Sequence, residues 1–125
     1  MTLALDHIQI AIPKGGEDLC RAFWGDLVGL REIAKPKPLQ ARGGLWFALA
    51  GSELHLGVEH PFAPAQKAHP GFRTTDIAAL AARFETAGHA LTWDVAIEGR
   101  KRFFATDPFG NRLEFLQDND PVSSF

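Results

Sequence analysis

Apolar and polar residues alternate near the start of the chain, over residues 5–12 (LDHIQIAI). Ile8, Ile10 and Ile12 share one parity, whereas His7 lies on the other. Because successive side chains point to opposite faces of a strand, this pattern predicts a half-buried strand. We expect its isoleucine face to contact a helix and His7 to point to the other side of the sheet.

The pattern then changes to a helical spacing over residues 17–28, and Gly29 follows where a helix would end. Residues 36–44, with the basic residues Lys35, Lys37 and Arg42, form a loop that is either a lid over a site or a connector. Alternation predicts three strands around this loop, at residues 31–35, 45–49 and 53–59.

The same order of elements recurs after a proline-containing linker at residues 60–67. Thr75 or Asp76 can cap a helix that ends at Gly88. Strands are expected on either side of this helix, at residues 69–73, 91–97, 102–106 and 112–117. Each half therefore reads strand, helix and three strands. We predict a single α+β domain, residues 1–125, made of two modules at about 4–60 and 68–118.

Composition excludes several classes of protein. The net charge of −2 over 125 residues provides no basic surface, so nucleic acid is not an expected partner. Cys20 is the single cysteine, which rules out an intrachain disulfide and fits a cytoplasmic location. The start of the chain does not resemble a signal peptide, and the apolar stretches are too short to cross a membrane.

Four polar side chains share a notable position relative to the predicted strands. His7 and His69 open the first strand of each half, and His55 and Glu114 lie in the last. A carboxylate within an apolar strand is costly to bury unless its charge is compensated. If the two halves pair about a pseudo-twofold axis, all four side chains can surround one divalent ion. Each histidine taken singly fits a structural or surface role equally well.

Other residues suggest how a substrate could be held. Arg102 and Arg112 can bind a carboxylate or phosphate. Trp46 and Phe104 either line an apolar pocket or belong to the core. Glu53 and Glu59 share the parity of His55 and are candidates to move a proton, although a solvated glutamate at a strand end is the simpler interpretation of each.

Two stretches, LDHIQIAIP at residues 5–13 and DPFGNRLEFLQ at residues 107–117, resemble the vicinal oxygen chelate superfamily. This superfamily includes glyoxalase I, bleomycin-resistance proteins and extradiol dioxygenases. The resemblance implies two βαβββ modules that form a cup-shaped half-barrel around a metal. His7, His69 and Glu114 match the three commonest ligands of the family. His55 stands where glyoxalase I-like members have glutamate, so it either completes the shell or contacts substrate.

The resemblance implies an enzyme that uses a divalent metal (Ni, Co, Zn, Mn or Fe) and binds a small substrate through two adjacent oxygens. Glu114 would be both a ligand and the catalytic carboxylate. Lyase, isomerase, thiol transferase and dioxygenase activities all remain open. The alternatives are a metal-independent binding protein of the bleomycin-resistance type and a metal-free structural or regulatory module. A homodimer is expected.

Overall fold

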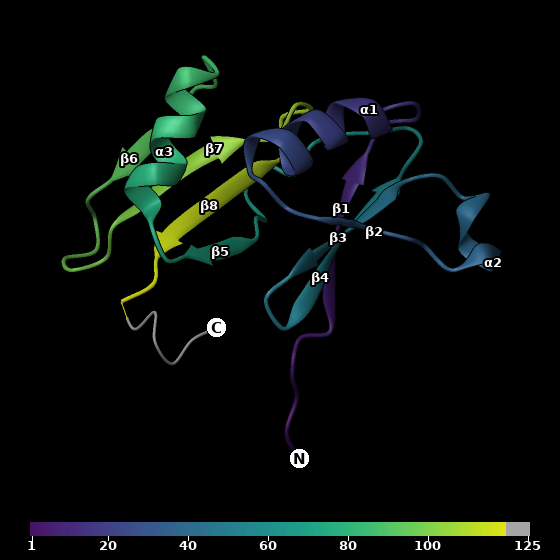
Figure 1. Ribbon diagram of the computed structural model, residues 1–125, viewed down its shortest axis with the longest axis horizontal. Helices are drawn as coiled ribbons and strands as arrows, with labels where there is room; N and C mark the ends of the chain where they lie inside the picture. Colours follow the sequence, from purple (N-terminus) through teal and green to yellow (C-terminus); the bar gives the residue numbers. More distant parts are fainter. Residues whose placement is uncertain (120–125) are drawn as a thin grey trace. The chain divides into compact units, whose positions relative to one another are not determined.

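The computed structural model describes residues 1–119 and divides the chain into two compact units, Met1–Pro64 and Ala65–Phe125. We call them the N-terminal unit and the C-terminal unit. Each contains one four-stranded sheet (Figure 1). The division falls inside the linker predicted at residues 60–67, so the repeated order of elements in the sequence corresponds to two structural units.

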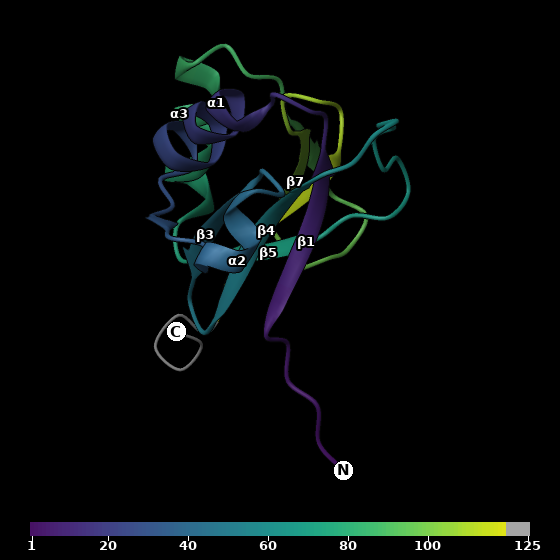
Figure 2. The same cartoon turned by 90° about the vertical axis from the view of Figure 1, so that its right-hand side faces the viewer.

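The N-terminal unit has the strand order β1-β4-β3-β2, in which β1 runs parallel to β4 and the other neighbours are antiparallel. Figure 2 labels three of these strands, β1, β4 and β3. Its elements are β1 (His7–Ile12), α1 (Glu17–Cys20), the π-helix η1 (Arg21–Leu27), β2 (Glu32–Ile33), α2 (Lys37–Gln40), β3 (Leu45–Leu49) and β4 (Ser52–Val58).

The C-terminal unit repeats this topology with the order β5-β8-β7-β6, again with a parallel first pair. Its elements are β5 (Gly71–Thr74), α3 (Ile77–Thr86), β6 (Thr92–Asp94), β7 (Arg102–Thr106) and β8 (Arg112–Gln117). Asp76 caps α3, since its Oδ1 accepts a hydrogen bond from the backbone N–H of Ala79 at 3.0 Å. The predicted α+β class with two βαβββ units is confirmed.

Several predicted boundaries differ from the structure. The helix predicted over residues 17–28 is present, but its second half is π-helical: the N–H of Val28 donates to the carbonyl of Phe23, five residues earlier, at 2.9 Å. Gly29 ends it with a φ of 91°, a conformation that glycine adopts without strain. The loop predicted at residues 36–44 contains the single helical turn α2, which starts after Pro36.

Two strands are shorter than the sequence pattern suggests. β5 begins at Gly71, so His69 lies just before the strand. Of the strand predicted over residues 91–97, only Thr92–Asp94 pairs with β7. Alternating residues indicate an extended backbone, but they do not show where a neighbouring strand stops providing hydrogen-bond partners.

The two faces of each sheet differ in what they contact, as the alternation of the sequence predicted. In the N-terminal unit Ile10 and Ile12 are buried, whereas His7 is exposed on the opposite face. In the C-terminal unit the ring of Phe84, on α3, packs edge-on against Phe103 and Phe115, with centroids 5.4 and 5.6 Å apart. The helix therefore covers one face of this sheet. Residues of the opposite parity in β7 and β8 point to the other face.

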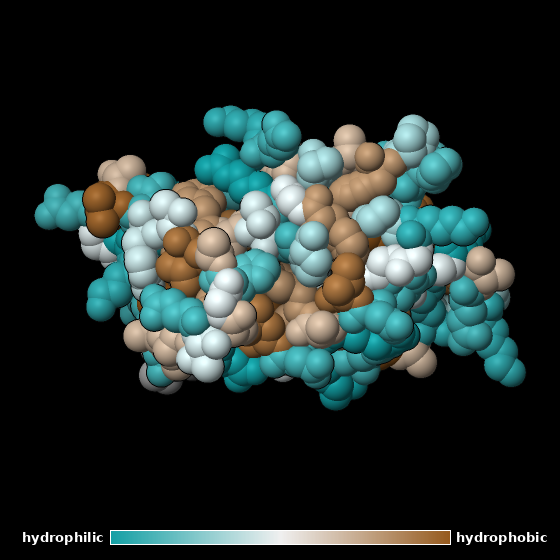
Figure 3. Space-filling view, turned by 90° about the horizontal axis from the view of Figure 1, so that it is seen from above, coloured by the Kyte–Doolittle hydropathy of each residue, from teal (hydrophilic) through white to brown (hydrophobic). Residues whose placement is uncertain are grey.

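Apolar and hydrophilic side chains are interspersed on the face of the molecule shown in Figure 3. Among residues 1–119, the exposed large apolar residues are Met1, Leu3, Leu5, Leu19, Trp93, Val95 and Ile97. Within residues 1–119, no helix has the length and apolar character needed to span a bilayer.

Candidate functional site

The turn before β8 is built from side-chain hydrogen bonds. Oδ1 of Asp107 accepts from the N–H groups of Phe109 and Asn111, both at 2.9 Å, and Asn111 Nδ2 donates to Asp107 Oδ2 at 2.8 Å. Asn111 Oδ1 in turn accepts from the N–H of Ala65 at 3.0 Å. This network joins the start of the C-terminal unit to the hairpin, and it fixes the strand that carries Glu114.

Glu114 is buried, with a relative exposure of 8%. Its Oε1 lies 2.9 Å from Nε2 of His69, and its Oε2 accepts from Nη1 of Arg102 at 3.1 Å. Burial raises the pKa of Glu114, but hydrogen bonds from His69 and Arg102 and the charge of Arg102 outweigh it, so the pKa lies below its ordinary value. The carboxylate therefore has compensating partners within its own unit.

His69 has an acceptor on each side of its ring. Nδ1 lies 2.9 Å from the carbonyl oxygen of Lys67, and Nε2 lies 2.9 Å from Glu114 Oε1. With Nδ1–H donating to the carbonyl, a positive centre, either a proton or a cation, has to lie between Nε2 and the carboxylate. Two neighbouring ligands at ~2.1 Å from a metal ion are about 3 Å apart, so this pair has the spacing of adjacent ligands.

His7 has the same kind of support. Its Nδ1 lies 2.9 Å from Oδ2 of Asp6, and with Nδ1–H donating to this carboxylate, Nε2 is the ring nitrogen left for a metal ion. A histidine that binds a metal commonly donates its other ring N–H to a carboxylate or a backbone carbonyl. His7 and His69 both follow this rule. Sequence reasoning missed Asp6, although its position directly before His7 was a usable signal.

His55 is held differently. It is buried, and its ring is sandwiched between Trp46, at a centroid distance of 3.8 Å, and His7, at 4.2 Å. Its Nε2 lies 2.9 Å from Oε1 of Glu53. The planes of His7 and His55 differ by only 16°. Since a ring-nitrogen lone pair lies in the ring plane, two rings stacked in this way cannot both direct a nitrogen at one ion.

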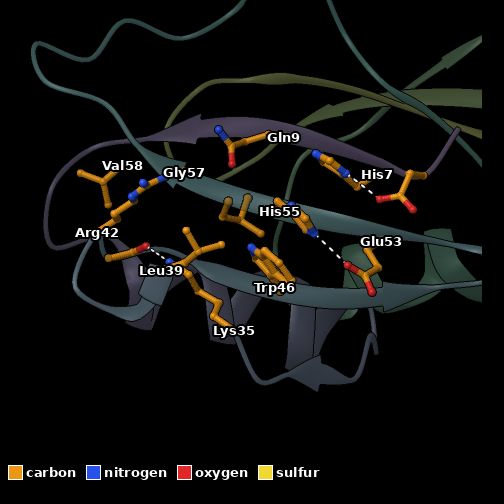
Figure 4. Close-up of a pocket in the computed structure, with 13 residues that line it drawn as sticks. His7, Gln9, Lys35, Leu39, Arg42, Trp46, Glu53, His55, Gly57 and Val58 are labelled. Atoms are coloured by element: carbon orange, nitrogen blue, oxygen red, sulfur yellow. Dashed lines mark hydrogen bonds and ion pairs between the residues drawn. The ribbon is translucent and has the colours of Figure 1, made fainter. Parts of the chain in front are cut away.

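These rings line a pocket of about 510 Å³ in the N-terminal unit (Figure 4). The loop between β2 and β3 contributes one wall, which supports the prediction that it covers a site. The lining residues are Asp6, His7, Gln9, Lys35, Leu39, Arg42, Gly43, Trp46, Glu53, His55, Leu56, Gly57 and Val58.

In the C-terminal unit, the ring of Phe104 lies beneath Arg102 and Arg112, the two arginines predicted to bind substrate. The guanidinium carbon of Arg112 is 4.4 Å from the ring centroid, and that of Arg102 is 5.2 Å away. Arg102 is committed to two carboxylates, because its Nη2 also donates to Asp94 at 2.9 Å. Of the two, Arg112 has the side chain better placed to meet an anion.

One solved structure decides the family of this chain. A protein assigned to the glyoxalase family from Bacillus anthracis is 40% identical, with a TM-score of 0.92 over 95% of this chain and 98% of that one. This chain belongs to the glyoxalase family. The resemblance to the vicinal oxygen chelate superfamily, drawn from residues 5–13 and 107–117, is therefore confirmed. A search with family models and a search of curated proteins both returned no match.

More distant solved structures share the glyoxalase fold. A lactoylglutathione lyase from Agrobacterium tumefaciens is 18% identical, with a TM-score of 0.72 over 99% of this chain and 98% of that one. An antibiotic binding protein from a Streptomyces species is 21% identical, with a TM-score of 0.75 over 94% of this chain and 98% of that one. At these identities the likeness concerns fold alone.

The candidate ligands of this glyoxalase-family protein are divided between its units. His7 and His55 belong to the N-terminal unit, and His69 and Glu114 belong to the C-terminal unit. Within the described residues of either unit taken alone, three His, Cys, Asp or Glu side chains are not gathered as a metal site would require. The predicted convergence of all four residues stays a prediction.

Proposed function

We propose that this glyoxalase-family protein is a divalent-metal-dependent enzyme that binds a small substrate through two vicinal oxygens. The proposed ligands are His7, His69 and Glu114. The observation that supports the proposal best is the common support of the two histidines: each presents Nδ1 to an oxygen, Asp6 Oδ2 for one and the Lys67 carbonyl for the other. That arrangement leaves Nε2 as the ligand atom in both.

The donor set suits the proposed group. Two imidazole nitrogens and one carboxylate oxygen favour Ni, Co, Zn, Mn or Fe over Mg or Ca. When bound, such an ion would supply Lewis-acid stabilisation of negative charge on the substrate oxygens. The protein's part is orientation. Asp6 and Lys67 fix the two rings, and Arg102 holds Oε2 of Glu114, which leaves Oε1 facing His69.

His55 has a separate role in this proposal. Its stack with His7 argues against a fourth ligand, so we assign it to holding Trp46 and His7 in position. Glu53 lines the pocket, is 39% exposed at its side chain and contacts His55 Nε2. This carboxylate can accept a substrate proton while hydrogen-bonded to His55. Proton movement of that kind favours a lyase or isomerase over the other reactions open to the family.

We further expect a homodimer and a cytoplasmic location. A row of exposed apolar side chains follows the edge strand β6: Trp93 is 46% exposed, Val95 91% and Ile97 46%. Apolar side chains beside an unpaired sheet edge favour association with a second surface. The location rests on the single cysteine alone.

A second candidate function is metal-independent binding of a small molecule. The ion pair between Arg102 and Glu114 favours it, because it compensates the buried carboxylate without an ion. The stacked rings of the N-terminal pocket also suit capture of an organic ligand. This alternative predicts tight binding in the presence of a chelator and no product.

The two functions are separated by metal analysis of the purified protein, followed by titration with Ni, Co, Zn, Mn and Fe. The enzyme proposal predicts one ion per chain and saturable binding. It predicts turnover in a screen with methylglyoxal plus glutathione, fosfomycin plus thiols, and catechols. Metal content at background level, with no saturable binding of any of these ions, would contradict it and support the binding protein.

A further inference from the structure

The N-terminal pocket has one wall that the proposed metal chemistry does not use. This wall is the loop around α2, which is held by three side-chain hydrogen bonds. Lys35 Nζ donates to the carbonyl oxygen of Gly43, and Gln40 Nε2 donates to the carbonyl oxygen of Lys35 at 3.1 Å. The N–H of Gly44 donates to Oε2 of Glu17 at 2.9 Å. The ammonium group of Lys35 is therefore occupied by a hydrogen bond within the loop.

Arg42 differs from Lys35 in this respect. It lines the pocket and is exposed, and its guanidinium makes no hydrogen bond or ion pair to any residue of the described range 1–119. Figure 4 shows it beside Gly57 and Val58, at the end of the pocket away from Glu53. The two carboxylates that line the pocket, those of Asp6 and Glu53, contact His7 and His55 and not Arg42.

Gln9 provides a second donor near the same end of the pocket. Its amide lies across β4 because residue 57 is glycine: a Cβ at Gly57 would come within 2.7 Å of Cδ and Nε2 of Gln9. In Figure 4 the Gln9 side chain lies over Gly57, on the strand next to it. Within residues 1–119 the amide has no hydrogen-bond partner, so it is available to a ligand.

We infer that Arg42, together with Gln9, binds an oxyanion of the ligand, either a carboxylate or a phosphate. A guanidinium presents a planar fork of donors that matches both groups. The inference rests on the proposed function in one respect, that the ligand bound there is the enzyme's substrate. The substrate class is then a small molecule with vicinal oxygens at one end and an anionic group at the other. Arg42 selects for that group.

The test uses probes that need no metal. Benzoate, its neutral analogue benzamide, and inorganic phosphate are titrated into the full chain in EDTA, and binding is followed by the NMR shifts of backbone and indole N–H groups. We expect an anion to bind more tightly than benzamide and to shift the signals of Arg42 and Gln9. The tighter of benzoate and phosphate identifies the carboxylate or the phosphate form.

Arg42→Gln should weaken the favoured anion at least tenfold and leave benzamide unchanged. Arg31→Gln is the matched control, since Arg31 is also exposed and does not line the pocket. Gly57→Ala, which displaces the Gln9 amide, should give a smaller loss. Equal binding of benzoate, phosphate and benzamide, or unchanged anion binding by Arg42→Gln, would overturn the inference. Because EDTA is present throughout, this result is independent of whether the protein binds a metal.

Discussion

The Nε2 atom of His69 and the Oε1 atom of Glu114 lie 2.9 Å apart, although 45 residues separate them in sequence. The parallel pairing of β5 with β8 brings them together, because it sets Gly71 opposite Glu114 and His69 precedes Gly71 by two residues. Residues two apart share one face of a strand. The proximity is thus a consequence of strand register, and two of the three proposed metal ligands are brought together within one unit.

His69→Ala should lower the affinity for the bound metal by about 100-fold or more. Loss of a residue that only supports a ligand lowers metal affinity by ~10–100-fold, and this variant removes the ligand atom itself. Isothermal titration with zinc measures the change. His60→Ala is the control, since His60 is exposed and outside the proposed shell. Equal zinc affinity in His69→Ala and the wild type would remove His69 from the site.

Asp6→Asn should weaken metal binding by about 10–100-fold without removing a ligand. The carboxylate accepts from Nδ1 of His7, and an amide in its place holds the ring and its tautomer less firmly. Asp18→Asn is a matched control, because Asp18 is an exposed acid that pairs with Arg21 and not with a histidine. If the two variants bind zinc alike, the supporting role of Asp6 is wrong.

Arg102→Gln should lower the free energy of unfolding of the metal-free protein by about 1.5–3 kcal/mol, the usual value of hydrogen bonds to charged groups. The loss should shrink when zinc is present, since the ion then compensates Glu114. Urea unfolding with and without zinc measures both quantities. The exposed pair between Arg21 and Glu32 provides the control: Arg21→Gln should change stability by less than about 1 kcal/mol, equally in both conditions. A penalty for Arg102→Gln that zinc leaves unchanged would argue against a cation at Glu114.

Stability of the metal-free protein should fall on acidification through the titration range of Glu114. Burial raises the pKa of Glu114, but its bonds to His69 and Arg102 lower it further, to below the ordinary value. Its contribution is therefore complete above the unfolded-state pKa of roughly 4.3 and is lost as the pH falls through the lower folded-state pKa. The unfolding free energies of the wild type and Glu114→Gln should thus converge at low pH. Parallel profiles across the acid range would show that Glu114 is not the group responsible.

The fold could be predicted largely because its signals are local. Alternation in β1 separated His7 from the isoleucines, and the residues that α3 buries, Ile77, Leu80, Ala81 and Phe84, recur in the sequence at a helical spacing. In β8, Glu114 alternates with Phe115, which contacts Phe84 of α3, so Glu114 points to the face that α3 does not cover. Each of these inferences needs only the period of one element, 2 for a strand and 3.6 for a helix.

The partners of the site residues could not be predicted in the same way. The stack of Trp46 on His55 depends on the register of β3 against β4, and the contact of Arg102 with Glu114 depends on that of β7 against β8. Register is set by turn geometry and packing across strands, which a single strand's pattern does not contain. For this reason Arg102 was expected to meet substrate and instead pairs with Glu114.

The Asp107–Asn111 turn opens the second of the two stretches that resemble the family, yet its polar groups hold the hairpin and the backbone of Ala65. The part of the sequence that indicates the family therefore has a structural role. One substitution at Glu114, a few residues further on, would remove a proposed metal ligand while leaving that turn untouched. A related protein that lacks this glutamate would still carry the turn, even if it only bound a small molecule without converting it. Membership of the family and the capacity for the proposed chemistry are therefore inferred from different residues of one hairpin.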